Sequence, residues 1–130
     1  MSSDRPSEVF FDRSLGKRSA EILREHGWIV HTIADHYPND AQNIADEVWI
    51  AEGCRRGWIL FTKDHKIRYR AEELEALSGH LFCIPSGNLN TQEMADRFIL
   101  ATGAIIHAIG ANSVGFWHVY AEGKIKRMWP

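Results

Sequence analysis

The sequence predicts an α/β fold in which helices cover both faces of a central, mainly parallel sheet. Four short apolar segments alternate along the chain with segments whose apolar residues recur at helical spacing. Each apolar segment is continuous and does not alternate with polar residues, which is typical of parallel strands buried on both faces. Two further strand-like segments close the chain, and we expect them to form a β-hairpin at the edge of the sheet.

The expected strands and helices follow one another in a regular order. The first four strands cover residues 9–11, 28–30, 58–62 and 81–84, and the helices between them cover residues 17–26, 41–56 and 67–77. A glycine follows each of these helices at or near its end, where a left-handed residue commonly terminates a helix. Residues 35–39 are polar and are expected to form a loop.

The C-terminal third is expected to begin with one long helix. It starts near Thr91, whose hydroxyl can cap it, and continues to about Ile109. The apolar stretch at 98–111 is too short to cross a bilayer and carries polar residues, so we predict a buried core helix and no membrane association. The hairpin then pairs residues 115–120 with residues 125–129.

Composition sets the class of protein. The chain has 130 residues, of which 45% are hydrophobic and 25% charged, with a mean hydropathy of -0.29. These values exclude disordered, collagenous and membrane classes, and we expect one domain over 1–130 with a flexible segment at 1–8. The net charge of -2 leaves only a local basic patch for nucleic acid. Two cysteines and a polar start favour a reducing, cytoplasmic location.

Acidic residues follow two of the expected strands. Asp12 ends the first strand and Asp64 follows the third, so both are expected at the sheet edge where sites of open α/β folds lie. Asp46 and Glu47, in the helix before the third strand, are a further source of carboxylates. Carboxylates brought together repel one another, and a divalent cation removes that conflict. Oxygen ligands suit Mg²⁺ or Mn²⁺, which can activate a water for attack on a phosphodiester.

Each acid also has a simpler explanation. Asp12 could start a turn or cap the next helix, Asp64 could cap the helix near residue 67, and Asp46 and Glu47 could lie on a solvated face. The combination favours the metal site. Basic residues gather around the third strand, where they could hold a phosphate backbone or form a solvated rim. They are Arg55, Arg56, Lys63, Lys66, Arg68 and Arg70.

Three segments resemble the PIN-like domain family, and within it the branch related to VapC-type toxins of bacterial toxin–antitoxin systems. They are residues 10–16 (FFDRSLG), 46–50 (DEVWI) and 57–68 (GWILFTKDHKIR). The resemblance implies a three-layer α/β/α sandwich, Mg²⁺- or Mn²⁺-dependent cleavage of RNA and a cognate antitoxin protein. It also implies that Asp12, Asp64 and one of Asp46 and Glu47 are the family's acids, and that Thr62 is its hydroxyl residue.

The leading hypothesis is therefore a metal-dependent endoribonuclease, the toxin of a toxin–antitoxin pair. Asp12, Asp46 and Asp64 would hold the metal, with Glu47 as helper or substitute. The expected contacts to RNA come from Thr62, Lys63, Lys66 and Arg68. Members of the family usually carry a further acid late in the chain, for which the candidates are Glu93 and Asp96, and such domains often form homodimers.

Two alternatives stay open. One is a catalytically inert PIN-like module that binds a partner through its C-terminal hairpin, where Trp117 and Trp129 would form the surface. The other is a receiver-like domain phosphorylated on Asp64, which is disfavoured because Asp12 has no acidic neighbour. A zinc site is not expected, because the histidines at 26, 31 and 36 fall on a helix end, a strand and a loop with no shared face.

Overall fold

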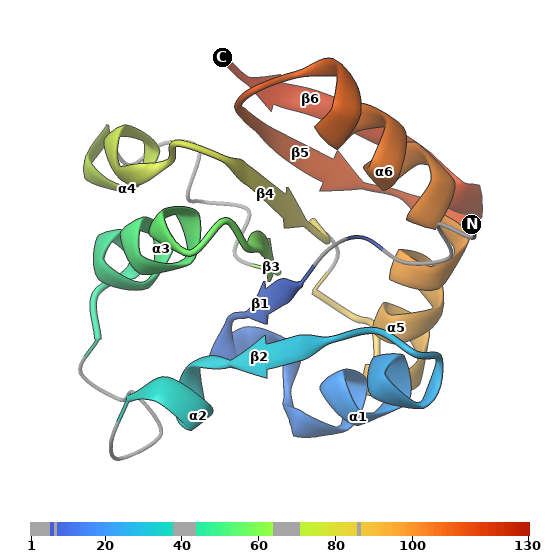
Figure 1. Ribbon diagram of the computed structural model, residues 1–130. Coiled ribbons are helices and arrows are strands. Elements are labelled where there is room, and N and C mark those ends of the chain that lie inside the picture. The colour runs from blue at the N-terminus through green and yellow to red at the C-terminus, as the bar shows by residue number, and fades with distance from the viewer. Residues whose placement is uncertain (1–5, 7, 38–43, 64–70, 86) are drawn as a thin grey trace.

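A computed structural model describes residues 6, 8–37, 44–63, 71–85 and 87–130 (Figure 1). One six-stranded sheet lies at its centre, with the strand order β2-β1-β3-β4-β5-β6. The first five strands of that order are parallel, and β6 runs antiparallel to β5 at the edge. The predicted α/β fold with a C-terminal hairpin at the sheet edge is confirmed.

The strands are short and the helices fill the connections between them. The strands are β1 (Val9–Phe11), β2 (Val30–Thr32), β3 (Ile59–Thr62), β4 (His80–Cys83), β5 (Gly115–Val119) and β6 (Ile125–Trp129). The α-helices are α1 (Lys17–Glu25), α2 (Ile33–His36), α3 (Asp46–Arg55), α4 (Ala71–Ala76), α5 (Thr91–Leu100) and α6 (Thr102–Ala111). Short 3₁₀ turns lie at Arg13–Leu15 and Ala121–Gly123.

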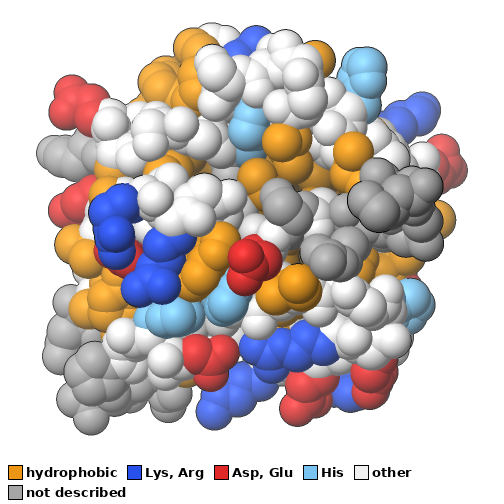
Figure 2. Space-filling view, in the orientation of Figure 1, with side chains coloured by type: hydrophobic (Ala, Val, Ile, Leu, Met, Phe, Trp, Pro, Cys, Tyr) orange, Lys and Arg blue, Asp and Glu red, His pale blue; other side chains and the backbone are white. Residues whose placement is uncertain are grey.

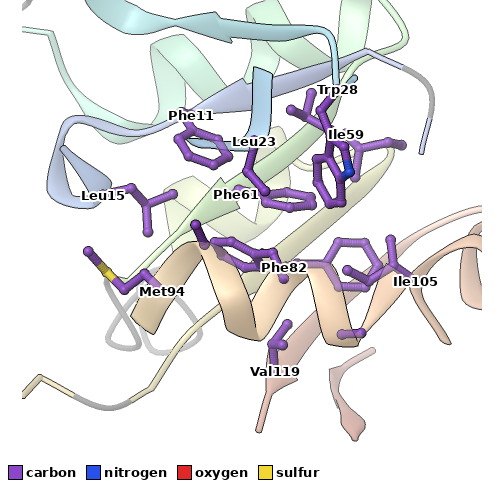
Figure 3. Packing of buried hydrophobic residues seen from close by; sticks show 14 of the residues in the cluster. Phe11, Leu15, Leu23, Trp28, Ile59, Phe61, Phe82, Met94, Ile105 and Val119 are labelled. Carbon is purple, nitrogen blue, oxygen red and sulfur yellow. The ribbon is translucent and has the colours of Figure 1, made fainter. Parts of the chain in front are cut away.

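The helices form a layer on each side of the sheet. On one face α1, α5 and α6 pack against the sheet, as Figure 3 shows for Leu23, Met94 and Ile105 around Phe61 and Phe82. On the other face, α2 and α3 lie with the segment after α4 over a second apolar cluster. Neighbouring strand residues point to opposite faces, so a strand covered on both sides is apolar at most of its positions.

The order of the parallel strands reverses at the centre of the sheet. The chain passes from β1 outward to β2, then returns across β1 to β3 and continues through β4 and β5. The connections after β1 and β3 therefore leave toward different sides, and a crevice forms at the carboxyl ends of these two strands. The register pairs Phe11 with Phe61, which places Asp12 and Thr62 side by side at this point.

The segment around β2 differs from the prediction. The ladder begins at Val30 instead of residue 28, because Trp28 directly follows the Gly27 turn and packs into the core before the strand starts. The expected polar loop begins instead with α2. Thr32 and Asp35 form a capping box at its start, in which each side chain bonds to the other residue's backbone N–H.

The long C-terminal helix is in fact two helices, α5 and α6, bent by 55°. The Thr102 hydroxyl donates to the Ile99 carbonyl at 2.7 Å, a bond that competes with the helical ladder and bends it. The N-cap is Asn90 and not Thr91, since the Asn90 side chain accepts from the Glu93 N–H. In the described part of the chain no single helix could span a membrane, and this bent pair passes the test by length and composition only.

The hairpin matches its predicted bounds to within a residue. Its turn places Glu122 and Gly123 at φ values of 65° and 76°. Trp117 is only 8% exposed, with its ring 5.9 Å from that of Phe82, and Trp129 is half-buried. The prediction of a partner surface is therefore wrong for Trp117, which is buried, whereas Trp129 stays partly accessible. The predicted helices at 41–56 and 67–77 lie partly outside the described residues, which contain α3 and α4.

Candidate active site

Asp12 lies at the end of β1 and is fixed from two directions. Its backbone N–H donates to the Phe61 carbonyl at 2.9 Å, which extends the β1–β3 ladder by one bond. Its Oδ2 accepts two hydroxyl hydrogen bonds, from Ser14 Oγ at 2.8 Å and from Thr62 Oγ1 at 2.7 Å. The Thr62 side chain is completely buried. The hydroxyl bond therefore connects the ends of the two central strands through the carboxylate.

The surroundings of Asp12 work against its negative charge. Burial raises the pKa of the Asp12 carboxyl above its usual range, and the charge of Asp46 raises it further. The hydrogen bonds from Thr62 and Ser14 act in the opposite direction without cancelling these effects. A carboxylate held in this way is stabilised by any cation placed between it and Asp46.

Asp46 is the first residue of α3, and a buried tryptophan holds its side chain. The Trp49 indole Nε1 donates to Asp46 Oδ1 at 2.9 Å, and Trp49 is 1% exposed. The Trp49 ring packs edge-on against Phe10 of β1 at 5.9 Å, so the acid on the helix is tied to the strand that carries Asp12. Glu47, the next residue, is exposed. Of the two helical acids, Asp46 is the one whose charge acts on Asp12.

The donor chemistry fits a hard divalent cation. Asp12 and Asp46 offer carboxylate oxygens, and their mutual repulsion is the condition that a Mg²⁺ or Mn²⁺ ion relieves. Within the described residues no three acidic, histidine or cysteine side chains converge on one point. The third predicted ligand, Asp64, lies outside the described residues, as do Lys66 and Arg68. Lys63 is described: its backbone N–H donates to Ser14 Oγ at 3.2 Å.

Two other groups of predicted residues do not gather here. Arg55 and Arg56 lie at the far end of α3, about 14 Å along the helix from Asp46, and both pair with Glu52. On the face seen in Figure 2, basic side chains lie among acidic ones instead of forming a continuous basic surface. Neither candidate for the fourth acid joins Asp12 and Asp46 in a described metal cluster. Glu93 accepts from the Asn90 N–H at the start of α5, and Asp96 accepts from Gln92.

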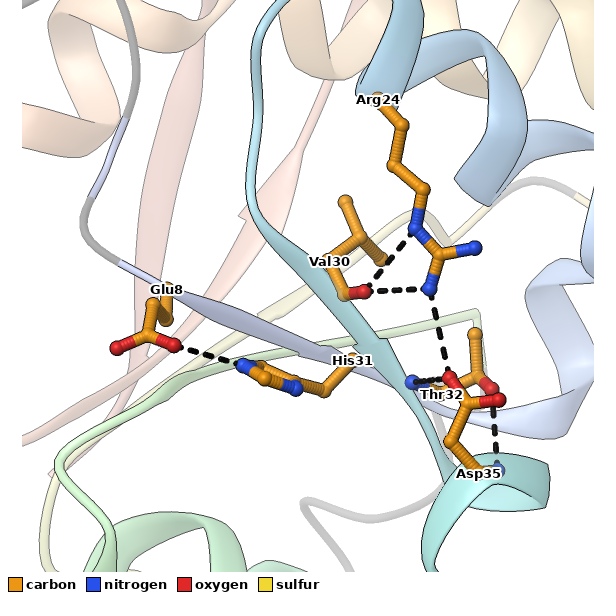
Figure 4. Close-up of polar contacts among 6 residues, drawn as sticks. All are labelled: Glu8, Arg24, Val30, His31, Thr32 and Asp35. Carbon is orange, nitrogen blue, oxygen red and sulfur yellow. Dashed lines mark hydrogen bonds and ion pairs between the residues drawn. The ribbon is translucent and has the colours of Figure 1, made fainter.

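The prediction that the histidines at 26, 31 and 36 share no face is corrected in part. His31 and His36 do share a face, with ring centroids 5.6 Å apart, and His31 stacks on Trp58 at 3.8 Å. His31 Nε2 also lies 2.8 Å from a Glu8 carboxylate oxygen (Figure 4). Among the residues described, however, no three such side chains are arranged so that they could hold a metal ion.

Sequence reasoning missed Ser14 and Trp49. Each has a spacing that could have revealed it. Ser14 is two residues after a strand-ending aspartate, where a hydroxyl can reach back to the carboxylate. Trp49 is three residues after Asp46 on a helix, a spacing that brings two side chains together.

Comparison with known proteins gives the class to which this fold and site belong. A family model described as "PIN like domain" matches residues 7–85, which include both central strands, Asp12, Asp46 and Thr62. The chain belongs to the PIN-like domain family. Within the family it is similar to the Mycobacterium tuberculosis (strain ATCC 25618 / H37Rv) protein named "Putative ribonuclease VapC45". The two are 36% identical over 105 residues, which cover 77% of this chain and 76% of that protein.

That similarity is consistent with the VapC-type branch. No solved structure matches the chain. The receiver-like alternative loses its support, because the matched family is PIN-like.

Proposed function

We propose that this protein is a metal-dependent endoribonuclease, the toxin of a toxin–antitoxin pair. The observation that carries the proposal is the pair of carboxylates at the carboxyl ends of the central strands, where the charge of Asp46 acts on the buried Asp12. The relative with 36% identity bears the name of a ribonuclease of the VapC type, which supports RNA as the substrate and an antitoxin as the partner.

In this proposal Asp12, Asp46 and Asp64 hold one Mg²⁺ or Mn²⁺ ion. Such an ion supplies a water of lowered pKa and stabilises the negative charge that develops on the phosphodiester oxygens. Glu47 is exposed beside Asp46 and is proposed to act as a helper, on a water or on the substrate.

The chain's own residues orient Asp12 and oppose part of the effect that burial has on its charge. The Thr62 and Ser14 hydroxyls donate to one oxygen of the carboxylate, and hydrogen bonds of this kind favour the charged form that a cation needs. The sequence suggested that Thr62 contacts RNA. Because its side chain is fully buried, its role in this proposal is instead to position Asp12. Lys63, Lys66 and Arg68, which follow Thr62 in the chain, are proposed to bind RNA phosphates.

The test is cleavage of total RNA by the purified protein in Mn²⁺. Discrete products that disappear in EDTA, in Asp12→Asn and in Asp64→Asn are expected. Ser7→Ala, which lies outside the three resemblance segments, is the control variant and should cleave as the wild type does. Full cleavage by Asp12→Asn would refute the assignment of the site.

The inert-module alternative is tested with the same protein. A metal site stabilises the folded chain by linkage, so Mn²⁺ should raise the melting temperature of the wild type and not that of Asp12→Asn. No cleavage together with no Mn²⁺-dependent shift would favour the inert module.

A further inference from the structure

A groove leads away from Asp12 between α1 and the β2–α2 segment. Its first part is a pocket of about 180 Å³ at the carboxyl ends of β1 and β2, lined by Phe11, Asp12, Arg13, Gly16, Lys17, Thr32, Ile33 and Ala34. A second hollow of about 340 Å³ continues from it along α1 and shares the residues Lys17, Thr32 and Ala34 with the first. Asp12 therefore forms one end of a path wide enough for part of a ligand.

The positive charge at the Asp12 end of this groove is not compensated. Arg13 and Lys17 are exposed, and in the described part of the chain their side chains make no ion pair or hydrogen bond. Further along α1 the arginines are paired: Arg18 lies 3.4 Å from Glu21, and Arg24 lies 3.4 Å from Asp35. The groove therefore has its free cations beside the catalytic carboxylate and balanced charges at its far end.

The far wall of the groove is held rigidly. Arg24 donates to the Val30 carbonyl through Nε at 3.1 Å and through Nη2 at 2.5 Å, and it also reaches Asp35 (Figure 4). Asp35 in turn bonds to the Thr32 backbone, and its own N–H donates to Thr32 Oγ1 at 3.3 Å. The Thr32 hydroxyl is thus held by Asp35, because it accepts from the Asp35 N–H and its hydrogen bond to the Asp35 carboxyl lowers the pKa of that group.

The floor of the pocket is apolar. Phe11 and Ile33 are 1% and 2% exposed, and Ala34 adds a small side chain at the rim. An apolar floor beside two free cations matches two parts of a nucleotide, an unstacked base and its phosphate. Duplex RNA cannot enter such a pocket because its bases are stacked inside the helix.

We propose that this groove binds the nucleotide next to the scissile phosphodiester of a single-stranded RNA. Arg13 and Lys17 hold the phosphate of that nucleotide, and the pocket over Phe11 and Ile33 receives its base. The inference rests on the proposed function for the position of the scissile bond at Asp12. It adds a subsite on the β2 side of Asp12, away from the side on which Lys63 follows β3.

The test measures binding without cleavage. A fluorescent single-stranded RNA of about ten nucleotides is titrated with protein in EDTA, at salt concentrations between about 50 and 200 mM. Lys17→Gln and Arg13→Gln should each weaken binding about threefold or more and reduce the salt slope by about 0.7, the change expected for one phosphate contact on a single strand. Lys124→Gln, the same change on the exposed hairpin turn, should alter neither.

A second variant tests the base pocket separately from the charge. Ala34→Leu fills the pocket without changing any charge, so it should weaken single-strand binding and leave the salt slope as in the wild type. Its melting temperature should also match the wild type, which excludes misfolding as the cause. Duplex RNA should bind more weakly than the single strand and should not respond to Ala34→Leu.

The outcomes separate this proposal from the proposed function. Equal affinity and slope for Lys17→Gln and Lys124→Gln overturn the subsite, as does the absence of RNA binding by the wild type at low salt. If the wild type cleaves RNA and the groove variants cleave it at the wild-type kcat/KM, the subsite fails and the nuclease stands. If the wild type binds RNA through the groove but never cleaves it, the nuclease fails and the subsite stands.

Discussion

Replacing Thr62 by valine removes one hydroxyl from the site with little change of shape. The Thr62 hydroxyl donates at 2.7 Å to Asp12 Oδ2 and is completely buried, so water cannot take its place. A hydrogen bond to a charged group contributes about 1.5 to 3 kcal/mol. In Thr62→Val the pKa of Asp12 should rise further above its usual range, because burial and the charge of Asp46 remain while one opposing hydrogen bond is lost.

The consequence should appear in metal affinity. A protonated Asp12 cannot hold a cation, and loss of a residue that positions a ligand typically lowers metal affinity or activity about 10- to 100-fold. Thr62→Ser is the matched control. It keeps the hydroxyl and loses one methyl group, which costs about 1 kcal/mol of folding stability but should leave the metal affinity close to that of the wild type.

The assay is calorimetric titration of both variants with Mn²⁺, followed by RNA cleavage at saturating metal. Thr62→Val should bind Mn²⁺ weakly and regain part of its affinity as the pH rises, since a higher pH restores the ionised carboxylate. Thr62→Ser should melt earlier than the wild type yet bind Mn²⁺ normally. If Thr62→Val binds Mn²⁺ within about twofold of the wild type, or if serine is as damaging as valine, the assigned role of the hydroxyl is wrong.

Three further predictions concern stability. Gly53→Ala should destabilise the fold by about 1 to 3 kcal/mol, because the new Cβ would collide with Leu60 and lie 2.9 Å from Phe10 Cδ2. Gly103→Ala has open space around it and should stabilise α6 by about 0.5 to 1 kcal/mol. Thermal melts of both variants check this, and equal shifts in melting temperature contradict it. Asp46→Asn should lower the pKa of Asp12 by removing a neighbouring charge. As the pH rises from the ordinary pKa of an aspartate to the raised pKa of Asp12, folding stability should therefore decrease less in this variant than in the wild type. An unchanged pH profile of unfolding would count against the coupling between Asp46 and Asp12. Burial lowers the pKa of His80, whose Nδ1 accepts a hydrogen bond from Trp117, so the unfolded chain takes up a proton at a higher pH than the folded chain. Folding stability should therefore fall below about pH 6.5 by up to about 1.4 kcal/mol per pH unit. Trp117→Phe should weaken this pH dependence in urea melts, and the same slope in both proteins would disprove the link.

Much of the fold could be predicted from the sequence, because a strand buried on both faces leaves an unbroken apolar run. Val9–Phe11 and Ile59–Thr62 are of this kind. The predicted start of β2 was wrong because a residue can be buried there without belonging to the strand ladder. Trp28 is as apolar as a strand residue but lies in the turn before the ladder. The bend between α5 and α6 depends on whether the Thr102 hydroxyl turns inward to a carbonyl, which residue type alone does not determine.

The candidate site divides in the same way. Asp12 and the helical acids could be predicted because carboxylates at strand ends and helix starts follow from position along the chain. The choice between Asp46 and Glu47 could not, since both fit the same helix turn and only packing separates them. Trp49 reaches back to Asp46 and holds it near β1, while the neighbouring side chain stays exposed.

In the proposed site, the raised pKa of Asp12 would connect folding to metal binding. An ionised carboxyl buried beside another carboxylate costs folding free energy, and two hydroxyl hydrogen bonds offset only part of that cost. A ligand that binds only the folded state at one hundred times its dissociation constant adds about 2.7 kcal/mol of stability. Variants that lower metal affinity, such as Thr62→Val, should therefore differ more from the wild type in melting temperature when Mn²⁺ is present than in EDTA. A variant that merely disturbs packing, such as Gly53→Ala, should lose the same stability in both. The difference between the two melting shifts thus separates residues that serve the site from residues that serve the fold, even before any RNA is added.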